Sequence, residues 1–312
     1  MLDISIVITN RNGADLLEEC LPRVCLAASN SGYSYEVILV DDHSKDESVR
    51  FIRDNFPQIQ IITLDQKIGF GEATNMGVRK SKAPVVILLN NDVKPAPDAF
   101  VYLLDHFQKE DVFAVATRIY RFDGTYLTGN HGGFFKYGHL TVINKREDDQ
   151  NPPLFVCGGA GAYHREKFLE LEGFDPLYHP FYYEDVDICY RAWKRGLRCV
   201  YEPRSLMYHK VQATITKEFK PEWVKLISAR NNYLFTWKNI SDPGLILSHL
   251  LYCPLFLIRD LFRGRMRFWK AFLRALLRLP NALAGRWKEQ AYLKVKDREI
   301  LKLIKGSVTT QN

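Results

Sequence analysis

Acidic side chains cluster at the start of a predicted helix in the second half of the chain. Glu184, Asp185 and Asp187 follow two tyrosines and begin a helical run that ends at Gly196. The positive end of the helix dipole favours ionised carboxylates, so Asp185 should stay charged near neutral pH and be able to accept a proton from a hydroxyl. Asp187 and Arg191 stand four residues apart, where they can form an ion pair. The same pattern suits an ordinary acid-rich helix start, so the cluster alone leaves both interpretations open.

A second set of polar side chains could bind a metal. Asn90, Asn91 and Asp92 follow an apolar strand directly and precede Pro95, so they project from a strand end into a turn. Divalent ions that carry substrate phosphates usually take one or two protein carboxylates, and phosphate oxygens and water complete the shell. His209 follows a short predicted strand and is a candidate imidazole ligand. The alternatives are an Asx turn at the strand end and a plain surface histidine.

Two further segments have residue types that suit a nucleotide. Asp41 and Asp42 end another strand, where two adjacent acids can accept hydrogen bonds from a base or a ribose; helix capping is the alternative. Gly69 and Gly71 open a helix, which allows a ligand to approach the backbone closely and presents a helix N-terminus to an anion. A simple glycine turn is the alternative there. The third glycine of the dinucleotide fingerprint is absent, so this segment does not predict NAD binding.

The elements that precede these side chains must position them. The first ninety residues alternate short β-branched runs with longer segments of helical spacing, which predicts a βαβ series. Continuous apolar runs such as VILV and VVILL fit a parallel sheet that is covered on both faces. In such a sheet, ligands collect at the carboxyl ends of the strands. The predicted strands are 4–9, 36–40, 59–64 and 85–89, and the predicted helices are 14–28, 46–55 and 71–81.

After residue 92 the pattern is less regular. Residues 121–153 are rich in glycine, aromatic and charged residues, which indicates hairpins and loops. Regular spacing returns beyond them, so we expect the α/β unit to continue to His209. The predicted elements of this part are helices over 98–108, 165–171 and 184–195 and strands over 113–117, 198–201 and 206–209.

Composition and charge limit the class of protein. The chain has 312 residues, of which 46% are hydrophobic, 25% charged and 13% aromatic, so it can bury a large core and is neither disordered nor collagen-like. The net charge of +7 divides unevenly, at −6 for residues 1–209 and +13 for residues 210–312. A basic region of this kind favours an anionic partner, either nucleic acid or an acidic membrane surface. Zinc-ligand spacings and RNP-like motifs are missing from the sequence, so we expect no nucleic acid.

The last third of the chain is predicted to be helical and amphipathic. Phe262, Met266, Trp269, Leu273 and Leu276 follow one another at steps of three or four, which predicts one apolar stripe flanked by cations. This is the pattern of a helix at a membrane interface. Packing on the protein's own core is the alternative.

The sequence predicts neither a membrane span nor secretion. Residues 244–258 are uncharged, but they contain Pro254 and are fewer than the ~20 that a spanning helix needs, so we do not expect them to cross a bilayer alone. The six cysteines form no C-x-x-C pair, and the start MLDISIVITN is unlike a signal peptide. We therefore expect a cytoplasmic protein that associates peripherally with the inner face of the cell membrane.

In their order along the chain, these segments resemble glycosyltransferase family 2, the inverting sugar-nucleotide transferases of GT-A fold. The resemblance runs from Ser5 to His209 and is carried by SIVITNRNG, VILVDDHSKD, IGFGEATNMGVRKSKAPVVILLNND, GGAGAYHREKFLELEGFDP and YYEDVDICYRAWKRG with the trailing MYH. It implies a Rossmann-like, mainly parallel sheet flanked by helices, and transfer of a hexosyl group from a UDP- or TDP-linked donor to a hydroxyl with inversion. The members it is most similar to add rhamnose or related sugars to lipid-linked or cell-surface polysaccharide precursors.

The resemblance also implies roles for residues at matching positions. Asp185 would be the catalytic base, with Glu184 beside it. Asp92 and His209 would hold Mg²⁺ or Mn²⁺ on the diphosphate, and Asn90 stands where the family's metal motif has an aspartate. The residues implied at the nucleotide are Thr9, Asn10, Arg11, Asp41, Asp42, Gly69, Asn75 and Asn91, and those implied at the acceptor or donor sugar are Gly158, Gly159 and Ala160.

We expect two regions in the chain. Residues 1–210 would form the catalytic domain, with a nucleotide-sugar half over 1–92 and an acceptor half over 93–210, and residues 211–312 a basic helical extension that associates with the membrane. Two other functions stay open. A degenerate site would leave a sugar-nucleotide-binding or scaffold protein. A nucleotidyltransferase is less well matched, because TNRNG follows the first strand in place of a glycine-rich basic loop.

Overall fold

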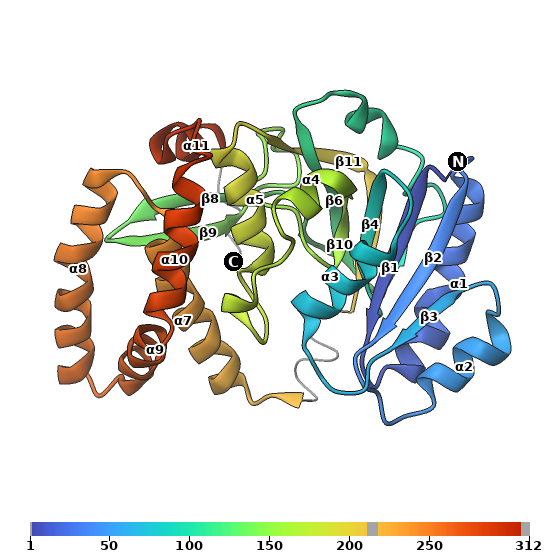
Figure 1. The fold of residues 1–312 in the computed structure, drawn as a ribbon, viewed down its shortest axis with the longest axis horizontal. Coiled ribbons are helices and arrows are strands. Elements are labelled where there is room, and N and C mark those ends of the chain that lie inside the picture. The colour runs from blue at the N-terminus through green and yellow to red at the C-terminus, as the bar shows by residue number, and fades with distance from the viewer. Residues whose placement is uncertain (1, 211–217, 307–312) are drawn as a thin grey trace.

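A nine-stranded sheet forms the centre of the molecule (Figure 1). The computed structural model describes residues 2–210 and 218–306. The strands of the sheet are β1 (Ile4–Asn10), β2 (Tyr35–Asp41), β3 (Gln60–Thr63), β4 (Val85–Asn90), β5 (Val93–Pro95), β6 (Val112–Arg121), β7 (Tyr126–Thr128), β10 (Ala160–His164) and β11 (Arg198–His209). Their order is β3-β2-β1-β4-β10-β6-β11-β5, and β7 pairs with β6. The strands β1 to β4 are mutually parallel, and β10 runs antiparallel to both of its neighbours.

Helices cover both faces of the sheet. They are α1 (Ala14–Asn30), α2 (Ser48–Asn55), α3 (Phe70–Lys80), α4 (Arg165–Glu170) and α5 (Glu184–Lys194). Ile4, Ile6 and Ile8 of β1 pack with α1 and α2 on one face, whereas Val7 packs with α3 on the other. Successive residues of a strand point to opposite faces, so a strand buried on both faces must be apolar throughout. The predicted α/β fold class is confirmed.

The parallel strands bring the polar strand ends to one edge of the sheet. In register, Asn10 of β1 lies beside Asp41 of β2, and Thr9 lies beside Asn90 of β4. Residues that are 31 and 81 positions apart in the chain therefore become neighbours. This edge is where the parallel arrangement predicts a ligand site.

The helix predicted over 98–108 does not form. The chain makes successive turns there, followed by a short 3-10 helix, Leu104–Gln108. The Ser205 hydroxyl donates a hydrogen bond to the carbonyl of Ala99 at 2.7 Å. The backbone N–H groups of Ala99 and Val101 donate to the carbonyls three residues before them, Ala96 O and Asp98 O, which is the pattern of turns and of a 3-10 helix and not of an α-helix.

The other predicted elements of this part differ only in detail. The two short strands predicted over 198–201 and 206–209 are one strand, β11, with a register shift in its middle. The segment 121–153, which we predict as hairpins and loops, contains β7 and a separate antiparallel pair, β8 (His131–Lys136) and β9 (His139–Asn144).

The C-terminal helices pack at the end of the molecule opposite β2 and β3, with α8 outermost (Figure 1). They are α7 (Pro221–Asn239), α8 (Pro243–Phe262), α9 (Met266–Leu276), α10 (Leu279–Gln290) and α11 (Asp297–Leu303). Tyr233 and Phe235 of α7 belong to the same hydrophobic cluster as Phe113 and Tyr163 of the sheet. The expected boundary between two regions near residue 210 coincides with the end of β11. The helices beyond it nevertheless pack into the same hydrophobic core as the sheet.

A buried ion-pair network ties these helices to α5. Asp187 is fully buried and accepts hydrogen bonds from Arg191 at 2.7 Å, as the spacing predicts, and from Lys238 of α7 at 2.9 Å. These two cations hold the pKa of Asp187 well below its usual range, against the effect of burial. Lys194 pairs with Asp297 of α11 at 2.8 Å. Loss of one partner from such a buried pair typically costs about 3–5 kcal/mol of stability.

The predicted apolar stripe lies on two helices and not on one. Phe262 ends α8, and Gly264, with φ at +64°, turns the chain before α9 begins at Met266. The helix α8 is 20 residues long and continues through Pro254. It extends past the uncharged segment 244–258 to include Arg259 and Asp260, so the apolar helix is longer than the segment that the sequence predicts. By length and composition α8 could cross a membrane, and 22% of its most apolar window is buried in the protein.

Candidate active site

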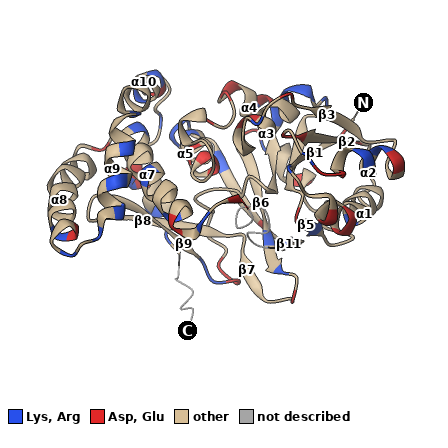
Figure 2. Cartoon of the chain, turned by 90° about the horizontal axis from the view of Figure 1, so that it is seen from below, with Lys and Arg blue, Asp and Glu red and all other residues tan. Residues whose placement is uncertain are grey.

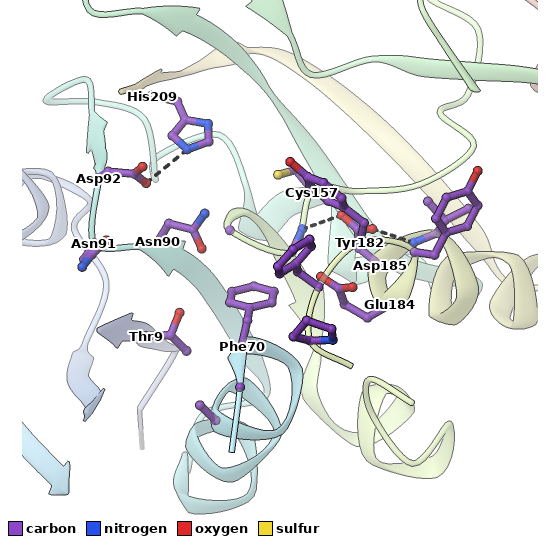
Figure 3. A pocket seen from close by; sticks show the side chains of 18 of the residues that line it. Thr9, Phe70, Asn90, Asn91, Asp92, Cys157, Tyr182, Glu184, Asp185 and His209 are labelled. Atoms are coloured by element: carbon purple, nitrogen blue, oxygen red, sulfur yellow. Dashed lines mark hydrogen bonds and ion pairs between the residues drawn. The ribbon is translucent and has the colours of Figure 1, made fainter. Parts of the chain in front are cut away.

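A cavity of about 590 Å³ lies at the carboxyl ends of β1 and β4, between the starts of α3 and α5 (Figure 3). Its wall is formed by segments that are far apart in the sequence, from residue 9 to residue 228. The predicted site residues that line it are Thr9, Asn10, Arg11, Asp42, Gly69, Asn91, Asp92, Gly158, Gly159, Glu184, Asp185 and His209.

Asn10 joins the loops that follow β1, β2 and β4. Its Nδ2 donates to Asp41 Oδ1 at 2.8 Å, and its Oδ1 accepts from Asn91 Nδ2 at 2.7 Å. Asp41 also accepts from the hydroxyl and the backbone N–H of Ser44. With its oxygens so occupied, Asp41 lies outside the lining of the cavity, where it holds the loops and does not face a ligand.

Asp42 fixes the loop that leads into α3. Its two carboxylate oxygens accept from the backbone N–H groups of Ile68 at 2.7 Å and Gly69 at 3.0 Å. Gly69 has φ at +89°, and a Cβ atom there would lie 2.8 Å from His179 Nδ1. Glycine is therefore required at this position both by the backbone and by the close approach of His179.

Two other predicted residues support the wall of the cavity without lining it. Asn75 exchanges two hydrogen bonds of 2.8 Å with the backbone of Phe174, whose ring stacks on that of Phe70 at 6.0 Å. Phe70 lines the cavity, and Asn75 does not. Ala160 is buried at the start of β10 and also lies outside the lining. The structure thus places both behind residues that face the cavity.

Asp92 and His209 face each other on one side of the cavity (Figure 3). His209 Nε2 lies 3.1 Å from Asp92 Oδ1, and Asp92 is 4% exposed. Oδ1 is buried and has no hydrogen bond of good geometry. A buried carboxylate oxygen without a donor, beside an imidazole nitrogen, fits a divalent cation. Within residues 2–210 and 218–306, no group of three or more acidic, histidine or cysteine residues forms a metal cluster, so substrate oxygens and water would complete the shell.

Gly158 and Gly159 form the wall between this pair and α5. The backbone N–H of Asn90 donates to Gly159 O at 2.8 Å, and a Cβ atom on Gly159 would lie 2.3 Å from the Asn90 side chain. Glycine therefore lets β10 begin directly against the end of β4. Asn90, which stands where an aspartate was expected, makes this packing contact.

Asp185 lies at the first turn of α5 and is partly open to the cavity. Its Oδ2 accepts from Gly158 N at 3.3 Å, and its Oδ1 accepts from Val186 N at 2.8 Å. Burial raises the pKa of Asp185 to about 6, although these N–H donors lower it. At neutral pH most of the molecules carry a charged carboxylate that can accept a proton, as the sequence predicts, but burial and not the helix dipole sets its strength as a base.

Glu184 is the neighbour of Asp185 and is more deeply buried, at 7% exposure. Its Oε2 has no hydrogen-bond partner among the described residues. Burial, together with the charge on Asp185, raises the pKa of Glu184 well above its usual range. Glu184 therefore holds its proton more firmly than Asp185, so Asp185 is the member of the pair that ionises first.

The turn that places Asp185 has a strained backbone. Tyr182 and Tyr183 both have positive φ, at 68° and 79°. Such conformations cost roughly 1–3 kcal/mol each and persist only where the surroundings hold them. Asn231 of α7 donates to the carbonyls of Phe181 at 3.0 Å and Tyr182 at 2.7 Å. A helix of the C-terminal region thus holds the turn that precedes the proposed base.

Sequence reasoning missed several residues of the wall. Glu218 accepts ion pairs from Arg11 and Lys67, each at 2.6 Å, and Phe219 beside it also lines the cavity. Residues 210–312 contain only seven acidic residues, and Glu218 is one of them. In so basic a region, an acidic residue is a candidate for a specific ion pair. The apolar end of the cavity is lined by residues of β6, β7 and β9. The sequence does not predict this lining, because most of this part of the chain is predicted to form hairpins and loops.

The chain matches the family model described as glycosyl transferase family 2 over residues 5–171. One relative is undecaprenyl-phosphate 4-deoxy-4-formamido-L-arabinose transferase of Pseudomonas fluorescens (strain SBW25), which is 31% identical over 106 residues. That match covers 33% of this chain and 31% of the relative. The chain thus spans about a third of the length of this curated relative.

Solved structures of similar fold cover nearly the whole chain. The structure of S. aureus TarS 1-349 with UDP-GlcNAc has a TM-score of 0.60 at 11% identity, and covers 96% of this chain and 90% of that one. A mannosyltransferase of Pyrobaculum calidifontis with GDP-Man and Mn²⁺ has a TM-score of 0.54 at 14% identity, and covers 93% and 89%. At these identities the likeness shows the fold, which is that of GT-A glycosyltransferases.

Proposed function

Because this chain belongs to glycosyltransferase family 2, we propose that it transfers a sugar from a nucleoside-diphosphate sugar to a hydroxyl of a lipid-linked or polysaccharide acceptor, with inversion. One observation carries this proposal. The same cavity is lined by the carboxylate of Asp185, the Asp92–His209 pair and the loop residues Thr9 and Asp42. A base, a cation site and a nucleotide site are thus within reach of one bound donor.

The donor would lie across the carboxyl ends of β1 and β4. Thr9, Arg11 and Asp42 would contact the nucleotide, and Asp92 with His209 would hold Mg²⁺ or Mn²⁺. A divalent cation there neutralises the charge that develops on the nucleoside-diphosphate leaving group. The Mn²⁺ bound with GDP-Man in the mannosyltransferase of similar fold supports this assignment.

Asp185 would act as the base. Its carboxylate accepts the proton of the acceptor hydroxyl while the hydroxyl oxygen attacks the anomeric carbon of the donor. The bond from that carbon to the diphosphate breaks in the same step, so the configuration inverts and no covalent enzyme intermediate forms. Glu184, whose pKa is raised by burial and by the charge of Asp185, would favour the negative charge of the pair on Asp185.

The C-terminal helices would place the enzyme on an anionic membrane, at the cytoplasmic face. One side of α8, with His249, Cys253 and Leu257, is buried against the protein. The other side presents exposed leucines, including Leu250 at 63% and Leu255 at 57%. A helix that is apolar on both sides, with one side uncovered, marks an interaction surface.

The charge of the next segment indicates which surface it meets. Arg263, Arg265, Arg267 and Lys270 are exposed at the turn after α8 and on α9, so cations border the uncovered leucines (Figure 2). Each cation near an anionic leaflet contributes about 1 kcal/mol to binding. The six cysteines are free thiols, which suits the reducing cytoplasm.

Nucleotide release from a panel of UDP-, TDP- and GDP-sugars, with and without Mn²⁺, tests the proposed function. We expect slow, metal-dependent hydrolysis of one donor by the purified protein, and its loss in Asp92→Ala. The exposed variant Asp54→Ala, at the far side of the sheet, is the matched control. If no donor is bound or hydrolysed, or if Asp92→Ala has full metal-dependent activity, the assignment of the site is wrong.

A further inference from the structure

Three arginines of the C-terminal helices gather beside the loop that leads into α5. Arg230 lies on α7, Arg274 on α9, and Arg278 at the start of α10. Arg230 Nη2 donates to His179 O at 2.6 Å, and Arg278 Nη1 reaches the same oxygen at 3.4 Å. Arg278 also donates to Leu177 O at 2.6 Å. Two guanidinium groups that share one carbonyl oxygen must lie side by side.

Among the described residues, no carboxylate pairs with this cluster. Arg230 is 5% exposed, yet none of the three arginines forms an ion pair within the described parts of the chain. Burial, with the charges of Arg278 and Arg274, lowers the pKa of Arg230 to about 10, so Arg230 is still cationic at neutral pH. A buried charge without an ion-pair partner is costly. A fold that retains the buried Arg230 beside the half-buried Arg278 and the exposed Arg274 has a local positive charge for which an anion is the matching ligand.

The cluster has N–H donors that make no hydrogen bond among the described contacts. A guanidinium group carries five N–H donors in a planar fork that suits phosphate oxygens. Arg230 uses Nε, to Asn231 Oδ1 at 2.9 Å, and Nη2, and Arg278 uses only Nη1 among the described contacts. Arg274 is exposed, and its guanidinium lies 4.9 Å from the centre of the Trp223 ring.

The position of the cluster connects the cavity to the apolar surface. Pro180, which follows the shared carbonyl of His179, lines the cavity, and so does Ser228, two residues before Arg230 on α7. On the other side, α9 and the turn after it expose Leu273 at 53% and Leu277 at 84%. Figure 2 shows basic segments on α7 and α9, which pack together. The arginines therefore lie between a polar site and an uncovered hydrocarbon surface.

We propose that Arg230, Arg274 and Arg278 bind the phosphate or diphosphate ester of a lipid-linked acceptor. The assignment rests on the proposed function and names the part of the acceptor that this site recognises. The hydrocarbon chain lies along Leu273 and Leu277, and the group that carries the reacting hydroxyl extends past Pro180 into the cavity. A charged phosphate bound to guanidinium groups provides the strong hydrogen bonds that fix the acceptor.

Binding of dodecyl phosphate to the full-length protein, below its micelle concentration, tests the assignment by calorimetry. Dodecanol and inorganic phosphate are the comparison ligands, and each is measured with and without saturating UDP and Mn²⁺. We expect dodecyl phosphate to bind more tightly than either comparison ligand, and UDP not to displace it. Equal affinity for inorganic phosphate would overturn the assignment to a lipid, and displacement by UDP would place the arginines in the donor site.

Variants connect the binding to the cluster. Arg274→Gln and Arg278→Gln should each weaken dodecyl phosphate binding about tenfold, because each removes a hydrogen bond to a charged group, and leave UDP binding unchanged. Arg274 holds no backbone group, so its substitution keeps the fold even if that of Arg278 disturbs the loop; thermal melting checks both. Arg267→Gln is the matched control, an exposed cation on α9 that lies over the Phe268 ring.

The outcomes separate this inference from the proposed function. An equal loss in Arg267→Gln would mean diffuse electrostatic attraction and would refute the site, and so would a failure of the wild-type protein to bind dodecyl phosphate. Donor hydrolysis does not need the acceptor. A protein that hydrolyses a sugar nucleotide but ignores dodecyl phosphate therefore contradicts only the arginine site.

Discussion

Glu184 and Asp185 are adjacent carboxylic acids with different environments. Both are removed from bulk water, but Asp185 accepts two backbone N–H groups, and Glu184 Oε2 has no hydrogen-bond partner among the described residues. N–H donors stabilise the charged form of an acid, whereas burial alone favours the neutral form. A proton bound to the pair is therefore held preferentially by Glu184, and Asp185 is the acid that ionises first and can accept a proton from a hydroxyl.

This difference predicts opposite results from two conservative substitutions. Asp185→Asn should lower transfer about 10²- to 10⁴-fold, because it removes the base. Glu184→Gln is the matched control and should retain most of the activity, since Glu184 is the acid of the pair that holds its proton more firmly and is not the proposed base. In the wild type, kcat/KM should fall tenfold for each pH unit below about 6, as Asp185 takes up a proton, and be flat above it. A strong loss in Glu184→Gln or a flat profile down to pH 5 would contradict this assignment.

At the scale of elements, α7 holds the start of α5. Asn231 donates to three carbonyls of one loop, those of Tyr178, Phe181 and Tyr182, at 2.7 to 3.0 Å. The two tyrosines before α5 have positive φ, so without these donors the loop would relax toward ordinary backbone angles. The position of Asp185 therefore depends on a helix that lies about fifty residues further along the chain.

We predict that Asn231→Ala lowers kcat about ten- to hundredfold by displacing the base, while the KM for the donor and the affinity for UDP stay unchanged. Steady-state kinetics and UDP calorimetry measure the two effects separately. Asn55→Ala on α2 is the matched control, since its side chain contacts only the carbonyl of Phe51 in its own helix. A matching rise in the donor KM would mean that the loop binds the nucleotide sugar and does not position the base.

At the scale of the whole molecule, the C-terminal region has two opposite surfaces. Its inner surface is part of the hydrophobic core and the ion-pair network of α5, whereas its outer surface presents exposed leucines and arginines. Deleting the region would therefore remove the Asn231 hydrogen bonds to the loop before α5 along with the proposed membrane surface. Point substitutions on the outer side of α8 separate the two roles.

We predict that the double variant Leu250→Glu, Leu255→Glu keeps donor hydrolysis but reduces binding to vesicles that contain phosphatidylserine at least about tenfold, because each buried leucine contributes roughly 1.5–3 kcal/mol. Cosedimentation at low and high salt measures the binding. Leu26→Glu, at an exposed position of α1, is the matched control. Equal binding of the double variant and the wild type would show that α8 does not contact the membrane.

The local features of this protein were predictable from the order of its residues. Alternating strand and helix patterns predicted the parallel sheet, and the polar residues at its strand ends, among them Asp42 and Asp92, line one cavity as expected. These features depend on periodicity and on chain direction, which are properties of short segments. The i, i+4 pair of Asp187 and Arg191 was predictable for the same reason.

Contacts between distant segments set which polar residues face the cavity and which hold its wall in place. Asp41 and Asn75 are as polar as Asp42, but their hydrogen bonds to Asn10, Ser44 and Phe174 hold them behind the wall, whereas the loop before α3 holds Asp42 where it lines the cavity. The same is true of three other features. They are the hydrogen bonds from Asn231 to the loop before α5, the arginine cluster at His179, and the turn that separates α8 from α9. Each depends on contacts between residues about fifty or more positions apart or on a single turn, and the spacing of residue types in one segment carries no information about such contacts.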